Sequence, residues 1–138
     1  MKAKRVGALL ILAVVGIGVS QAANWQQFST SKSGAKGYTD YDRIKRDGYG
    51  QNTYTAWWRA DLAKPVSAKG KTFVSHLSLY RIDCDKSSLT TLAAHYYDAK
   101  GTVVFSEEFE SNPSVVIPDS SGELFVNAIC SAAKIRGL

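Results

Sequence analysis

Two histidines are the first side chains to consider for acid–base or metal chemistry. His76 and His95 each fall inside an expected strand, and neither has a second ligand at a spacing such as His-x-x-x-His. A protein metal centre needs three or four ligands that converge on one point. We therefore interpret both residues as strand histidines that make a local hydrogen bond, and we expect no metal and no cofactor.

Three neighbouring glutamates could supply the carboxylate pair of general acid–base catalysis. They belong to an edge-like strand, where charged side chains keep an open sheet edge from pairing with other chains, so we interpret them as a solvated acidic edge: Glu107, Glu108 and Glu110. The chain also lacks a Gly-x-Ser-x-Gly elbow, a phosphate-binding loop and a dinucleotide fingerprint. We predict that the protein is not an enzyme. The alternative is a hydrolase, and catalytic turnover that is abolished by His76→Ala or His95→Ala would support it.

The N-terminus has the features of a secretory signal peptide. A basic start precedes an apolar run over residues 6–19, and small residues follow for a signal peptidase to recognise. The run of 14 residues is shorter than the roughly 20 of a membrane-spanning helix, which is the alternative interpretation. With cleavage after Ala22 or Ala23, we predict a signal peptide over residues 1–22 and a single domain over residues 23–138.

Loss of the signal peptide changes the charge balance. The whole chain has 17 Lys and Arg against 12 Asp and Glu, and three of those positive residues lie in the signal, which leaves a formal charge of +2. This excess is too small to indicate nucleic-acid binding. The locally basic segment 34–47 is interleaved with aspartates, which favours a solvated surface. No cysteine lies near the cleavage point to carry a lipid anchor, so we expect export to the periplasm or cell surface without a stable membrane anchor.

The mature chain has the pattern of several strands followed by one helix, which is typical of an α+β fold. The clearest strand covers residues 53–62, in which apolar side chains alternate on one face: Tyr54, Ala56, Trp58, Ala60 and Leu62. Residues 65–70, with Pro65 and Gly70, are expected to end it. Further strands are expected over residues 25–30, 37–42, 72–84, 89–97 and 102–109.

The C-terminal helix and the two cysteines are connected in this prediction. Ser120 and Glu123 have the spacing of a capping box, which starts a helix, and Cys130 lies on its apolar stripe. Cys84 ends the long central strand. In an exported chain an even number of cysteines favours a disulfide, which here would tie the helix to the sheet. A metal pair or a redox dithiol are the alternatives.

A sheet that packs one helix leaves its other face for solvent or for a partner. Trp57 and Arg59 lie on the face opposite the alternating apolar residues, and Trp and Arg are enriched in interaction hot spots. Tyr49, in the turn cluster 46–50, is a third candidate binding residue. The alternative is that Trp57 packs on a cross-strand neighbour and only stabilises the sheet.

Several short motifs follow one another in a distinctive order along the mature chain. They are Trp25, Gly37-Tyr38-Thr39-Asp40, Arg43-Ile44, Trp57-Trp58, Tyr80-Arg81-Ile82-Asp83-Cys84, His95-Tyr96-Tyr97-Asp98-Ala99-Lys100-Gly101, Ile117-Pro118-Asp119-Ser120 and Ala128-Ile129-Cys130. In this order the chain resembles the surface-adhesin protein E-like family of Gram-negative bacteria, over nearly the whole mature length.

The resemblance implies a fold and a class of function. The fold is a single antiparallel sheet of about six strands, with the C-terminal helix packed on its concave face and tied by a Cys84–Cys130 bridge. The family takes its name from a protein that binds host extracellular-matrix and serum proteins such as laminin and vitronectin, so a protein partner is expected and a homodimer stays open. We hypothesise an exported, adhesin-like binding domain. The alternative is a periplasmic structural or inhibitory module that acts on an envelope partner, such as a cell-wall hydrolase.

Overall fold

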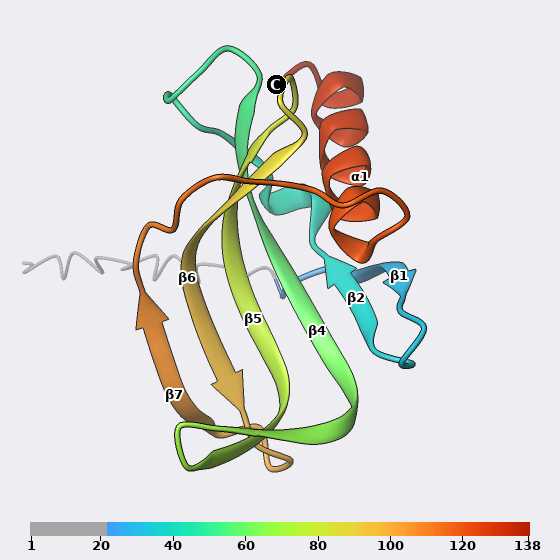
Figure 1. Ribbon diagram of the computed structural model, residues 1–138. Coiled ribbons are helices and arrows are strands. Elements are labelled where there is room, and N and C mark those ends of the chain that lie inside the picture. The colour runs from blue at the N-terminus through green and yellow to red at the C-terminus, as the bar shows by residue number, and fades with distance from the viewer. Residues whose placement is uncertain (1–21) are drawn as a thin grey trace, which may run out of the picture.

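The computed structural model describes residues 22–138, so the expected signal peptide lies outside the described residues except for Ala22. A curved antiparallel sheet is followed by one C-terminal helix (Figure 1). This confirms the predicted α+β fold. In chain order the elements are β1 Gln26–Thr30, β2 Lys36–Thr39, the 3₁₀ helix η1 Tyr41–Arg43, β3 Lys45–Arg46, β4 Thr53–Ala68, β5 Lys71–Asp83, β6 Ser88–Tyr97, β7 Val103–Glu108, β8 Ser114–Val115 and α1 Ser121–Arg136.

The sheet has eight strands, so the expected number of about six was too low. Six strands follow the order β1-β2-β4-β5-β6-β7, with neighbours antiparallel. The other two strands, β3 and β8, pair with β4 and β6 and have two residues each. Such short strands were missed because alternation is only recognisable over four residues or more.

The expected end of the central strand at residues 65–70 was also wrong, because β4 continues to Ala68. Its pairing with β5 runs from Thr53 to Asp61, lapses, and resumes at Val66. Pro65 lies in the unpaired stretch, where its missing N–H costs no ladder hydrogen bond. The strand therefore accommodates the proline at an irregularity instead of ending there.

The tip of the β4–β5 hairpin turns across the sheet toward β7 (Figure 1). Phe73 is buried there, with ring centroids 4.9 Å from Tyr96 and 5.9 Å from Phe105. Lys69, at the hairpin turn, forms an ion pair with Glu107 on β7. Glu107 is thus a partner of the hairpin, and the expectation of a simply solvated acidic edge is wrong for this residue.

The segment before β3 differs from the extended strand expected over residues 37–42. The strand β2 ends at Thr39, and Asp40 caps η1 by accepting a hydrogen bond from the backbone N–H of Asp42 at 3.0 Å. Asp40 also accepts from the N–H of Asn24 at 3.0 Å and pairs with Arg43 at 3.1 Å. Because Asp40 is only 2% exposed, the expectation of a solvated surface is wrong at this position.

The helix α1 starts where the capping spacing predicted. The N–H of Glu123 donates to the Ser120 hydroxyl at 3.2 Å, but the Glu123 carboxylate accepts from the N–H of Asp119 at 2.8 Å. In a capping box the Glu123 carboxylate would accept from the N–H of Ser120, but that N–H already donates to the carbonyl of Ile117 at 3.2 Å. The Glu123 carboxylate therefore bonds to the residue before Ser120, one position earlier than in a standard capping box.

The core lies between α1 and the face of the sheet that carries the alternating apolar residues. Phe125 of α1 is fully buried, with ring centroids 5.2 Å from Phe28, 5.0 Å from Trp58 and 5.8 Å from Tyr80. The buried members of the cluster are Ile44, Tyr54, Ala56, Ile82, Phe125, Val126, Ile129 and Ala133. The Cys84–Cys130 disulfide, with Cα atoms 5.9 Å apart, ties this helix to the end of β5. The predicted bridge is confirmed.

Candidate functional site

The face of the sheet opposite α1 is the candidate site, and we call it the open face. On β4 it is formed by Thr53, Thr55, Trp57, Arg59 and Asp61, with their paired residues on the neighbouring strands. Successive side chains of a strand point to opposite faces. Since Tyr54 and Ala56 are buried in the core against α1, the residues between them must turn away from the helix.

Trp57 is half-buried near the middle of this face. Its ring stacks on that of His95, with centroids 6.2 Å apart and planes at 29°. The Nδ1 atom of His95 in turn lies 2.8 Å from the Ser106 hydroxyl. Trp57 also lines a shallow depression of about 480 Å³ together with Arg43, Lys45, Thr55 and Leu79. It therefore packs on a cross-strand neighbour and still contributes to an accessible surface.

Arg59 follows on the same face and is held by two neighbours. Its Nε and Nη2 atoms donate to the two carboxylate oxygens of Asp61 at 3.0 and 2.6 Å, and its guanidinium lies 5.1 Å from the centre of the Tyr38 ring. The hydrogen bond to Asp61 is the main reason why the pKa of Arg59 is raised. With Trp25, Leu77 and others it lines a second depression, of about 240 Å³.

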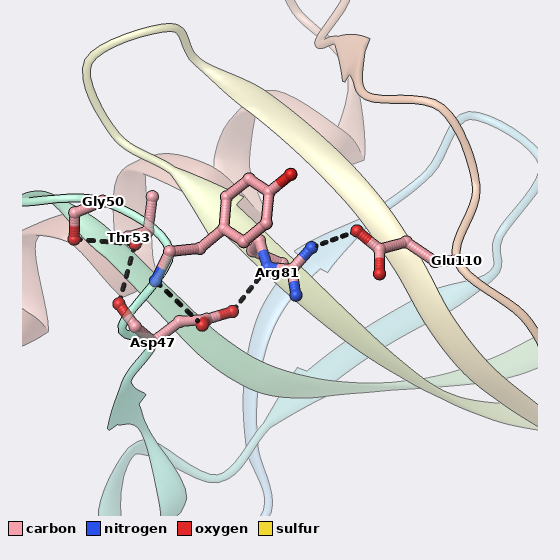
Figure 2. A network of polar contacts seen from close by, with 6 residues as sticks. Asp47, Gly50, Thr53, Arg81 and Glu110 are labelled. Carbon is pink, nitrogen blue, oxygen red and sulfur yellow. Dashed lines mark hydrogen bonds and ion pairs between the residues drawn. The ribbon is translucent and has the colours of Figure 1, made fainter.

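Tyr49 lies apart from these two residues, in the loop between β3 and β4. Tyr49 is 75% exposed, and the guanidinium of Arg81 lies 4.3 Å from the centre of its ring. Figure 2 shows how Arg81 joins Asp47 and Glu110. The Nε of Arg81 donates to Asp47 at 2.5 Å, and this hydrogen bond is the main cause of the raised pKa of Arg81.

A third depression, of about 650 Å³, surrounds this network, and we call it the Tyr49 groove. Its lining includes Tyr49, Arg81, Asp83, Ser88, Glu110 and Asn112. The three depressions follow one another along β4. Thr53 lines the Tyr49 groove, Thr55 and Trp57 line the depression of Trp57, and Arg59 lines the remaining one. The open face is thus hollowed along its length, and the candidate residues are divided among three hollows.

Sequence reasoning did not identify Arg81 as a candidate, and it assigned Glu110 to a solvated acidic edge, whereas Glu110 pairs with Arg81. The alternation of β5 held a signal for Arg81, since it has the same parity as Leu77 and Leu79 and therefore faces away from the core. No local signal connected Glu110 with Arg81. It follows β7 and reaches Arg81 across 29 residues of sequence, so only the folded chain brings the two together.

Each of the two histidines lies next to a serine hydroxyl. His76 lies 3.2 Å from the Ser78 hydroxyl through Nδ1, and burial lowers its pKa. Within residues 22–138, no group of three or more His, Cys, Asp or Glu side chains is placed to hold a metal ion. The same part of the chain holds no helix with the length and apolar character needed to cross a membrane.

Comparisons with known proteins agree with this architecture. Residues 25–131 match the family described as surface-adhesin protein E. A crystal form II structure of protein E from Haemophilus influenzae is 17% identical, covers 69% of this chain and 80% of that chain, and has a TM-score of 0.56. The crystal structure of protein E from non-typeable Haemophilus influenzae is 15% identical, covers 85% and 82%, and has a TM-score of 0.58. No curated protein matches the chain. At these identities the structural likeness shows the fold alone.

Proposed function

Because the chain belongs to the surface-adhesin protein E family, we propose that it is an exported, non-catalytic binding domain that attaches to host extracellular-matrix proteins through its open face. Membership of a surface-adhesin family supports an adhesin-like protein that is exported to the cell surface. The identity of the partner and the role of the open face are the new parts of the proposal. The signal peptide over residues 1–22 and the single binding domain over residues 23–138 belong to it.

The observation that carries the proposal is the pairing of Trp57 and Arg59 on a face that α1 leaves uncovered. Arg59 is 41% exposed and Trp57 is half-buried. Trp and Arg dominate the few residues that supply most of the energy of protein interfaces. Lys45 lines the same depression as Trp57, and its positive charge would favour an acidic partner surface.

Both residues are held in place before any partner arrives. The ring of Trp57 rests on His95, and the guanidinium of Arg59 is bound bidentately by Asp61 and lies on the Tyr38 ring. Ordering a long side chain on binding costs about 0.5–1.5 kcal/mol. Since the contacts on the sheet have already restricted these side chains, less of that cost remains for the binding step.

The proposal is tested by the binding of the purified mature protein to immobilised laminin and vitronectin. We expect Trp57→Ala and Arg59→Ala each to weaken binding tenfold or more, in keeping with hot-spot losses above about 1.4 kcal/mol. Ile135→Ala is the control, because Ile135 is 86% exposed on α1, away from the open face. Circular dichroism of each variant checks the fold. Binding that survives both substitutions would refute the open face as the adhesive surface.

Protease shaving of intact cells tests the location independently. An adhesin is expected to be cut on intact cells. If the protein is protected and appears only in a periplasmic extract, host attachment is wrong, and an envelope partner has to be sought instead. A lysozyme-inhibition assay would then test the inhibitory module.

A further inference from the structure

The Tyr49 groove is a second feature of the open face that the adhesive role of Trp57 and Arg59 leaves unexplained. It lies where β4 and β5 pair Thr53 with Asp83, next to the turn that leads to Ser88. The loop that carries Tyr49 and the segment that follows β7 both contribute to its lining. Its volume of about 650 Å³ falls within the roughly 300–1,000 Å³ of small-molecule pockets.

The ring of Tyr49 is exposed and yet fixed. The backbone N–H of Tyr49 donates to the Asp47 carboxylate at 3.2 Å. Figure 2 shows the Thr53 hydroxyl donating to the carbonyls of Asp47 and Gly50, both at 2.9 Å, which closes the loop on the sheet. Arg81 lies over the ring. Since Tyr49 is 75% exposed, the ring face that Arg81 leaves uncovered is offered to solvent without the freedom of an ordinary exposed side chain.

The charged groups of the groove already have partners inside the protein. Arg81 binds Asp47 and Glu110, and Lys86 pairs with Asp83 at 3.2 Å. Burial works to raise the pKa of Asp83, but hydrogen bonds from Lys86 hold it below the ordinary value. These pairs contain two positive and three negative side chains, so the groove has no excess positive charge to attract an anionic ligand. Carboxylate oxygens retain further lone pairs, however, and can accept hydrogen bonds from uncharged hydroxyl groups.

The remaining lining is uncharged and, apart from Gly50 and Pro113, polar. Ser88 and Thr90 belong to it, each 5% exposed, as does Asn112. A groove with an exposed ring, an amide, carboxylates and hydroxyls fits a ligand that has one apolar face and a rim of hydroxyl groups. Sugar rings have this character, because their C–H face stacks on an aromatic ring while their hydroxyls bond to planar polar groups.

We propose that the Tyr49 groove binds a neutral oligosaccharide. One sugar ring stacks on Tyr49, and its hydroxyls bond to Asp83, Glu110 and Asn112. This site is separate from the surface of Trp57 and Arg59 and does not depend on the proposed attachment to matrix proteins. Chains of this chemistry occur both on host glycoproteins and in bacterial surface polysaccharides.

The test is binding of the purified mature protein to an array of neutral host-type oligosaccharides, neutral bacterial O-chain oligosaccharides and sulfated chains. We expect binding to at least one neutral class, and the class bound identifies the source. Titration with the bound oligosaccharide should show a tenfold or greater loss in Tyr49→Ala and little change in Tyr49→Phe, which keeps the ring.

Trp57→Ala is the matched control, because it removes an aromatic ring from the same face but outside the groove. It should leave oligosaccharide binding unchanged, so that this proposal and the matrix-protein proposal can fail separately. Binding to sulfated chains alone, absence of binding to any neutral chain, or equal binding by wild type and Tyr49→Ala would each overturn the inference.

Discussion

Trp57 and Trp58 are neighbours in the sequence, but they belong to opposite faces of the same sheet. The ring of Trp58 packs among Phe28, Tyr80 and Phe125 under the helix. The ring of Trp57 rests on His95 and lines a shallow depression of the open face. A one-residue step along a strand therefore separates a residue that stabilises the fold from one that is available to a partner, and residue type alone does not tell them apart.

The two faces also differ in how their polar groups are used. Under α1 the contacts are mostly apolar and a disulfide supplements them. The open face holds ion pairs around Arg59 and Arg81. Ion pairs at a protein surface contribute only about 0–1 kcal/mol to stability, so their main consequence here is to position side chains. The covered face therefore supplies most of the stability, and the open face is the surface that we propose for binding.

The difference in stability between the two faces is tested most directly by truncation of each tryptophan. Trp58 is partly buried but packs against the core, so Trp58→Ala is expected to lower the free energy of unfolding by about 3 kcal/mol, the lower end of the range for buried aromatic residues. Trp57→Ala should cost about 1 kcal/mol or less, the scale of a cross-strand pair. Urea unfolding of both variants measures the difference. Equal losses would mean that the open face is also part of the stabilising core.

The disulfide is expected to have an effect of similar size. Replacement of Cys84 and Cys130 by Ala is expected to lower the free energy of unfolding by about 2–4 kcal/mol, because the bridge restricts a long loop in the unfolded chain. Thermal unfolding with and without reductant measures it, and reductant should not affect the variant. Thiol titration of the unfolded, unreduced wild type should find no free thiol. Two free thiols would show that the helix is not tied to the sheet in this way.

The smallest expected effect is a pH dependence caused by His76. Its ring lies on the same face as Ala60, to which it is paired, and burial lowers its pKa. The unfolded chain then binds the proton more tightly, so stability is lost as the pH falls below about 6.5, the ordinary pKa of histidine. His76→Gln should flatten the dependence of the unfolding midpoint between pH 7 and pH 5. An identical slope in wild type and variant would contradict this assignment.

Local patterns predicted much of the covered face. The alternation over residues 53–62 correctly assigned Tyr54 and Ala56 to the core, and the hydroxyl of Ser120 starts the helix. The prediction was wrong where the same residue type is compatible with two different local structures. Pro65 often ends a strand, but here it lies at a lapse in pairing, and Asp40 in a charged segment became a buried cap.

The amino-acid sequence by itself determined the two faces of the sheet, the helix and the bridge between them. These depend on periodicities of two to four residues and on the only pairing that two cysteines allow. Only the tertiary structure decided the Tyr49 groove. Its network joins Asp47, Arg81 and Glu110, which are 34 and 29 residues apart. Contacts at such separations depend on strand register and on the paths of two loops, and no local periodicity encodes these.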